Sequence, residues 1–310
     1  MRYWRHYPRL LQLALLLLLV FTLVSFSLVI ANFFAEKIYG VSALATASLN
    51  LQSPPKLIAA AKLVQTISSL FSFFGSALLF AYLAHPKPLE YVGLRKVVDK
   101  KQFVVVLVLM LSIIPILTQI GSWLQLLPLG KDALANQKQT SEMMSALLQM
   151  NSLPGLFLHL FVFALLPAAG EELLFRGVAL RMLFNYRPNI HFAIVLSAIF
   201  FALMHAQVFN LLPIMMAGIL LGYIYYLSGS IWLSIFAHFI YNGVQVVAIY
   251  LSGSKDVSNQ VANMDNYPWY ILILSVAISA LAIFMLIKNA TPLPRNWNND
   301  FEDINNNDVL

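Results

Sequence analysis

Long apolar runs recur along the whole of this sequence and leave few folds open to it. Of the 310 residues, 60% are hydrophobic and only 10% are charged, whereas a soluble globular domain carries about 25% charged residues. An apolar run of roughly 18 or more residues is long enough to cross a bilayer as a helix. The pattern therefore predicts an all-α protein, a polytopic membrane helix bundle with about eight transmembrane helices.

The runs divide the chain into a single membrane-embedded helical domain over residues 1–288 and a polar tail over residues 289–310. The tail is rich in Asn and Asp, so we expect it to be disordered. The first run is too long for the apolar part of a signal peptide, so we expect it to be retained. The expected spans are Leu10–Phe34, Leu57–Leu83, Phe103–Leu127, Leu153–Ala169 with a continuation to Phe184, Phe192–Val208, Leu211–Leu227, Ile231–Leu251 and Tyr267–Ile287.

The basic residues predict how this bundle is oriented. If the N-terminus is cytoplasmic, 13 of the 19 Lys and Arg residues fall on the cytoplasmic side and 5 on the opposite side. Cytoplasmic loops of membrane proteins carry such an excess, so we expect a multi-pass protein of the cell membrane with both termini cytoplasmic. The net charge of +6 therefore indicates no nucleic-acid partner, because the basic residues that produce it flank apolar runs instead of forming a basic surface patch. The absence of cysteine excludes disulfides and thiol catalysis.

Ionisable residues inside three of the spans are the strongest functional signal. Of the 13 acidic residues, only Glu171 and Glu172 belong to an apolar helix. His205 and His238 lie in two further spans, and Asn242 follows His238 by four residues. A charged side chain is costly inside a membrane, so its presence there is a functional-site hypothesis. A GxxxG in the sixth span, by contrast, indicates only helix packing.

The spacing of these residues indicates their chemistry. Glu172 and Arg176 are four apart and share a helix face, where they can form an ion pair. Glu171 is rotated from Glu172 by about 100° and can point into a cavity. A carboxylate beside an imidazole can activate water, and a His and an Asn on one face can stabilise an oxyanion. Alternatively Glu171, His205 and His238 can bind a metal such as zinc, although the HExxH signature is missing.

Three motifs stand in order on successive apolar helices. They read EExxxR, FxxxH and HxxxN, and they consist of Glu171, Glu172 and Arg176, then Phe201 and His205, then His238 and Asn242. With these motifs the chain resembles the CPBP family of intramembrane proteases. That family includes the type II CAAX prenyl endopeptidases and the bacterial abortive-infection (Abi) and bacteriocin-immunity homologues. The resemblance covers about residues 153–251, which we expect to form the protease core.

The resemblance implies a role for each motif residue. Glu171 would be the base that activates water, helped by His205. His238 and Asn242 would stabilise the oxyanion. The remaining pair of the first motif, Glu172 and Arg176, would hold the site together.

The resemblance leaves the metal question open. The family is often described as a metalloprotease family, but a metal-free glutamate mechanism fits the same residues. We expect no required cofactor. Zinc is the alternative, with Glu171, His205 and His238 as its ligands.

The function expected from these residues is that of an intramembrane endopeptidase. Its partners would be the lipid bilayer and a membrane-associated or lipidated peptide or protein. The alternative is a non-proteolytic membrane protein that binds or sequesters a peptide. A transporter that uses the two glutamates as a proton relay is less favoured, because the chain shows no inverted repeat. A fold does not fix a substrate, so the expected substrates include both prenylated and unmodified peptides.

Overall fold

The computed structural model describes residues 3–94, 100–252 and 267–293, and every regular element in these ranges is a helix. Within these described ranges, seven helices are long and apolar enough to cross a membrane. The predicted all-α, polytopic membrane fold is thereby confirmed. The single-helix spans are α1 (Arg9–Tyr39), α5 (Lys100–Gln125), α11 (Leu211–Ser228, preceded by the 3₁₀ turn η6, Val208–Asn210), α12 (Ile231–Leu251) and α14 (Trp269–Lys288).

The other two long spans are composite helices interrupted by π-helical turns. The first runs through α2 (Pro55–Ser69), η3 (Leu70–Gly75) and α3 (Ser76–Ala84). The second runs through α7 (Leu153–His159), η4 (Leu160–Leu165), α8 (Leu166–Glu172), η5 (Leu173–Ala179) and α9 (Leu180–Tyr186). Short elements complete the described chain: η1 (Trp4–His6), η2 (Leu44–Ser48), α4 (Pro88–Tyr91) and α6 (Lys131–Leu147).

The predicted fifth span, Phe192–Val208, is shorter in the structure. It is α10 (Ile190–Met204), whose 15 residues reach only about 22 Å, less than the roughly 30 Å of a bilayer core. The helix ends because Ala206 adopts a left-handed backbone conformation with a φ of 52°. Such a residue just beyond the last turn terminates a helix. His205 therefore lies at the end of α10.

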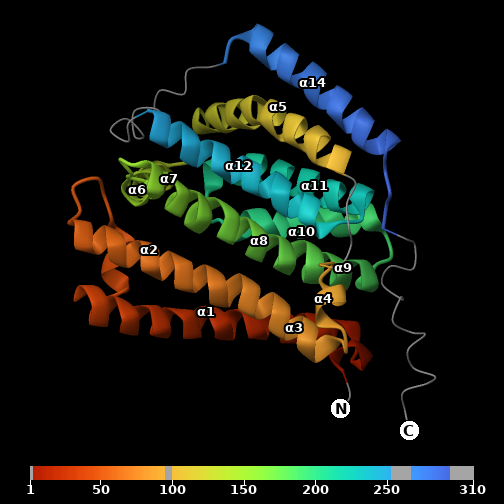
Figure 1. Ribbon diagram of the computed structural model, residues 1–310, viewed down its shortest axis with the longest axis horizontal. Helices are drawn as coiled ribbons and strands as arrows, with labels where there is room; N and C mark the ends of the chain where they lie inside the picture. The colour runs from red at the N-terminus through yellow and green to blue at the C-terminus, as the bar shows by residue number, and fades with distance from the viewer. Residues whose placement is uncertain (1–2, 95–99, 253–266, 294–310) are drawn as a thin grey trace.

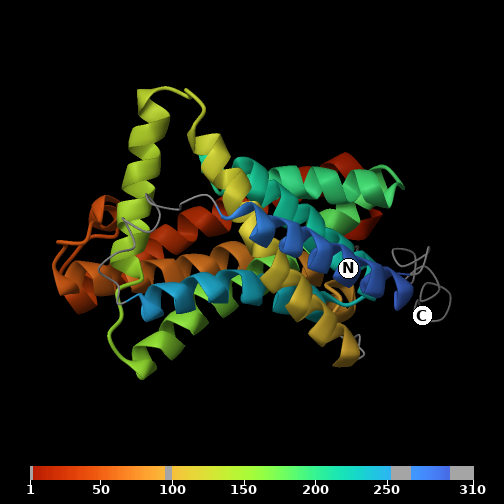
Figure 2. The same cartoon turned by 90° about the horizontal axis from the view of Figure 1, so that it is seen from above.

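The helices form three layers (Figure 1). α1 packs beside the composite helix α2–α3 on one side, and α5 packs beside α14 on the other. The composite helix α7–α9, together with α10, α11 and α12, lies between them. The four helices of the middle layer carry all three motifs, so the candidate residues sit in the interior of the bundle. Figure 2 shows α6, in yellow-green, extending out from the bundle.

The outer layers expose apolar side chains that a soluble protein would bury. In α1, Phe21 is 71% exposed, and in α14, Ile273 is 61% exposed. Covering such surfaces with lipid tails has no free-energy cost, whereas exposing them to water is unfavourable. The exposed faces of α1 and α14 therefore fit a bilayer on both sides of the bundle.

Both ends of the described chain lie at one end of the bundle. Trp4 packs edge-on against Phe80 with a centroid distance of 5.7 Å, and Leu293 packs on the same hydrophobic cluster. Two backbone amides of the predicted disordered tail donate hydrogen bonds to the end of α11. The amide of Thr291 donates to the carbonyl oxygen of Leu227 at 2.8 Å, and that of Leu293 to the carbonyl oxygen of Tyr226 at 2.9 Å. Residues 289–293 of the tail are therefore held against α11, while the rest of that tail, 294–310, lies outside the described residues. The cytoplasmic location of both termini stays a prediction.

Gly170 sets the distance between α8 and the composite helix α2–α3. A Cβ atom on Gly170 would lie 2.8 Å from Cβ of Phe73 and 2.9 Å from Cδ2 of Phe74. We expect Gly170→Ala to lower the free energy of unfolding by about 1–3 kcal/mol, because the packed helices must shift to admit the methyl group. Thermal unfolding of the protein in detergent micelles measures this loss.

Gly243→Ala is the matched control in α12. Its nearest neighbour, Cδ2 of Leu160, would be 3.6 Å away, which is ordinary van der Waals contact. Because alanine favours a helix by up to about 1 kcal/mol over glycine, Gly243→Ala should leave stability unchanged or raise it. Equal melting temperatures for the two variants would contradict the close approach at Gly170.

Candidate active site

The first motif lies where α8 gives way to a π-helical turn. Glu171 and Glu172 are the last residues of α8, and Arg176 belongs to η5. A second π-helical turn, η4, precedes α8. Such turns occur mostly as single bulges in α-helices and are frequent at functional sites. Here they flank the two glutamates, while α12, with the third motif, packs against both η4 and α8.

Glu172 is the centre of the polar network. Its side chain is fully buried, and its Oε1 accepts hydrogen bonds from Nη1 of Arg176 at 2.7 Å and from Nδ1 of His238 at 2.9 Å. Its Oε2 accepts a hydrogen bond from the hydroxyl of Ser234 at 2.5 Å. A buried charge is tolerated only when it is paired and hydrogen-bonded. The network therefore explains how an ionised Glu172 can exist inside the bundle.

Arg176 connects the first motif to α10 and α11. Its Nη2 donates to the carbonyl oxygen of Gly218 at 2.7 Å, and its guanidinium lies 5.2 Å from the ring centroid of Phe201. Gly218 packs closely on α10, since a Cβ there would lie 3.1 Å from Cβ of Ala198. The GxxxG of α11 therefore does more than pack helices, because its first glycine presents a carbonyl oxygen to the buried arginine.

His238 bridges the two glutamates. Its Nδ1 contacts Glu172, and its Nε2 lies 3.8 Å from Oε2 of Glu171. An ionised carboxylate only accepts hydrogen bonds, so the contact with Glu172 places a proton on Nδ1. The imidazole therefore directs Nε2 toward Glu171.

Glu171 differs from its neighbour in having no such network. It is 8% exposed, and its Oε2 is buried without a hydrogen-bond partner in the part of the chain that the structure describes. Nearly all buried polar atoms in proteins have a partner, so an exception calls for an explanation. A carboxylate oxygen beside an imidazole nitrogen is suited to hold and deprotonate a water molecule.

His205 and Asn242 complete the candidate set without a described hydrogen bond or ion pair to Glu171. Nδ1 of His205 donates to the carbonyl oxygen of Phe201 at 2.8 Å, which leaves Nε2 as an acceptor. The Phe201 ring packs edge-on against His205 and His238, at centroid distances of 4.7 and 5.7 Å. Asn242 is half-buried and makes no hydrogen bond to the described residues. Phe201 therefore joins the second motif to the third, and Asn242 keeps its amide available.

The possible zinc ligands are Glu171, His205 and His238. Among the described residues, no three or more His, Asp or Glu side chains are grouped so that they could hold a metal ion. Glu171 and His238 approach each other, but His205 bonds the carbonyl oxygen of Phe201 and forms no described hydrogen bond or ion pair with either of them. The arrangement of Glu171, His205 and His238 therefore does not fit a three-ligand zinc centre.

Two groups of the site were missed in the sequence. Ser234 stands four residues before His238, and this helical spacing was a usable signal. The carbonyl of Gly218 had no signal, because every residue carries a backbone carbonyl.

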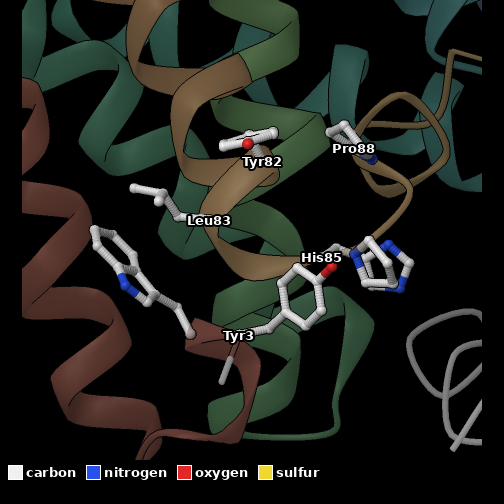
Figure 3. Close-up of a pocket in the computed structure, with 7 residues that line it drawn as sticks. Tyr3, Tyr82, Leu83, His85 and Pro88 are labelled. Carbon is white, nitrogen blue, oxygen red and sulfur yellow. The ribbon is translucent and has the colours of Figure 1, made fainter. Parts of the chain in front are cut away.

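A separate cavity lies at the end of the bundle that contains the N-terminal turn (Figure 3). Its volume is about 360 Å³, and it contains none of the motif residues. Burial lowers the pKa of its His85 to about 4, and Nδ1 of His85 accepts the amide hydrogen of Lys87 at 2.9 Å. His85 is therefore neutral near pH 7 and fixes the turn after α3. The lining residues are Tyr3, Trp4, Tyr82, Leu83, His85, Pro86 and Pro88.

One comparison with known proteins gave a match. Residues 153–244 match the family model described as type II CAAX prenyl endopeptidase Rce1-like. No curated protein and no solved structure matches the chain. The matched segment begins with α7 and includes all six candidate residues as well as Ser234. The match over residues 153–244 therefore supports the predicted resemblance of this segment to the type II CAAX prenyl endopeptidases of the CPBP family.

Proposed function

We propose that the protein is an intramembrane endopeptidase that hydrolyses a peptide bond in a membrane-associated or lipidated peptide or protein. One observation carries this proposal: the buried, unpartnered Oε2 of Glu171 lies 3.8 Å from Nε2 of His238. One water molecule can contact both atoms with hydrogen bonds of about 2.8 Å. That water would lie beside a base and, once Nε2 has taken up a proton as well, beside a donor able to stabilise negative charge.

In the proposed reaction, Glu171 takes a proton from the water as its oxygen attacks the carbonyl carbon of the substrate. The Nε2 of His205 is free to accept a hydrogen bond and assists in orienting the water. The carbonyl oxygen becomes an oxyanion, which the amide of Asn242 and His238, then carrying a second proton on Nε2 besides the one on Nδ1, stabilise by donating hydrogen bonds. When the C–N bond breaks, the protonated Glu171 returns its proton to the leaving amine.

Glu172 and Arg176 act on this site by orienting His238. Because the Glu172 carboxylate accepts from Nδ1, a protonated His238 has only Nε2 left to donate to an oxyanion. Arg176 offsets the charge of Glu172 and is itself tied to Gly218. We propose that the reaction needs no metal, a proposal supported by the poor fit of the three candidate ligands to a metal centre.

Cleavage of a quenched fluorescent peptide library by the purified protein tests the proposal. The library contains prenylated, acylated and unmodified peptides, and the cleavage rate of each peptide is measured with and without a chelator. We expect cleavage of a lipidated or apolar class at the same rate in both conditions. Loss of activity with chelator and recovery with zinc would contradict the metal-free mechanism. Binding of a peptide without cleavage would instead favour the sequestering alternative.

A further inference from the structure

The orientation of Glu172 depends on what holds each of its two oxygens. Oε1 is shared by Arg176 and His238, whereas the described hydrogen bond to Oε2 comes from Ser234. The last torsion of a glutamate side chain is broad, so rotamer preference alone does not fix the carboxylate plane. Contacts to both oxygens fix it, and Ser234 supplies the one at Oε2.

Ser234 is well placed for this contact. It is fully buried in α12, one helical turn before His238, so the two side chains project from the same face of the helix. Its hydroxyl also lies 3.1 Å from the carbonyl oxygen of Leu221 in α11. A hydroxyl donates only one proton. Donation to the charged carboxylate forms the stronger bond, and the Leu221 contact keeps the serine close to α11.

The tautomer of His238 follows from the orientation of the Glu172 carboxylate. The bond from Nδ1 to Oε1 determines which imidazole nitrogen carries the proton and which nitrogen faces Glu171. If the carboxylate turns, Nδ1 loses its acceptor and either nitrogen can carry the proton. Nε2 would then no longer be directed toward Glu171.

We propose that Ser234 is a positioning residue of this site: its hydroxyl holds the Glu172 carboxylate so that His238 keeps its proton on Nδ1 and directs Nε2 toward Glu171. The kinetic consequence of this role rests on the proposed peptidase activity. The structural consequence, the tautomer of His238, does not.

The kinetic test compares variants of Ser234 on a cleaved peptide. Ser234→Ala should lower kcat by roughly 10- to 100-fold and change KM less than about twofold, because the hydroxyl bonds a charged group but does not touch substrate. Ser234→Cys keeps the volume with a weak donor and should be equally impaired, whereas Ser234→Thr should recover most of kcat. Unchanged kcat in folded Ser234→Ala and Ser234→Cys would overturn the proposal.

Ser279→Ala is the matched control. Ser279 is also a buried membrane-helix serine, and its hydroxyl bonds that of Ser112 at 2.8 Å between α14 and α5, away from the motifs. Its loss should leave kcat and KM unchanged. A fall in kcat as large as that of Ser234→Ala would show a general packing effect and overturn the positioning role.

A second measurement separates this inference from the proposed function. The protein is labelled with ¹⁵N-histidine, and the His238 signals are assigned with His238→Gln. The wild-type spectrum should show a proton on Nδ1, and Ser234→Ala or Ser234→Cys should show a mixture of tautomers. An unchanged spectrum in both variants would overturn the role of Ser234. If the wild type cleaves no peptide, the proposed function fails, while the tautomer still tests Ser234.

Discussion

Replacing Glu171 by glutamine is expected to lower kcat for peptide cleavage by about 10²- to 10⁴-fold, the usual contribution of a general base. Glutamine has nearly the shape of glutamate but cannot take a proton from water. The Oε2 of Glu171 is buried and has no hydrogen-bond partner in the described part of the chain, so its proton affinity rather than its packing should matter. Steady-state kinetics of Glu171→Gln on the best library peptide measure the loss.

The melting temperature of Glu171→Gln serves as the control for this prediction. A buried carboxylate without a hydrogen bond is unfavourable, so its replacement by a neutral amide should leave the melting temperature unchanged or raise it. Glu172→Gln should behave differently, because the Glu172 carboxylate has three donors that its amide cannot satisfy equally. If Glu171→Gln retains full activity, Glu171 is not the base.

Replacing Arg176 by methionine is expected to lower the free energy of unfolding by about 3–5 kcal/mol, the usual effect of removing one partner of a buried ion pair. The Arg176 side chain is 2% exposed and its Nη1 lies 2.7 Å from Oε1 of Glu172, so its removal leaves an uncompensated buried charge on Glu172. The double variant Glu172→Gln/Arg176→Met removes both charges and should be less destabilised than the single variant. Denaturant unfolding in detergent micelles compares the two.

Lys87→Met is the control for this comparison. Lys87 and Glu90 also form an ion pair, but their charged atoms are 3.9 Å apart and the lysine side chain is 49% exposed. Exposed pairs contribute about 0–1 kcal/mol, so this variant should be close to wild type. A double variant of the buried pair that is as unstable as Arg176→Met would show that packing of the arginine side chain, rather than its charge, matters.

Hydropathy predicted the membrane fold and most of its helices, because the length of an apolar run fixes whether it can cross a bilayer. It failed at α10, where the residues around Met204 and Val208 are apolar but the helix has already ended at His205. The backbone conformation of Ala206 ends this helix, and alanine normally continues one. Hydropathy therefore carries no signal for this boundary.

The three motifs located the site in the interior of the bundle, but they did not predict its connections. Glu172 was assigned to Arg176 alone, because spacing along one helix shows only partners on that helix. The bonds from Ser234 and His238 cross between helices, and the bond from Arg176 ends on the carbonyl of Gly218. Such contacts depend on how helices are rotated against each other, which a single sequence does not record.

The π-helical turns on either side of α8 make chain length part of this site. Each such turn accommodates one residue more than an α-helical turn. If η5 lost that residue and became α-helical, the helix beyond it would keep its orientation, because the wider turn is what accommodates the extra residue. A deletion within α8, where no wider turn absorbs it, would instead rotate Glu171 and Glu172 by about 100° relative to α7, although every polar residue of the motif would still be present. An insertion or deletion in this helix can therefore inactivate the site as surely as the substitution of one of its glutamates.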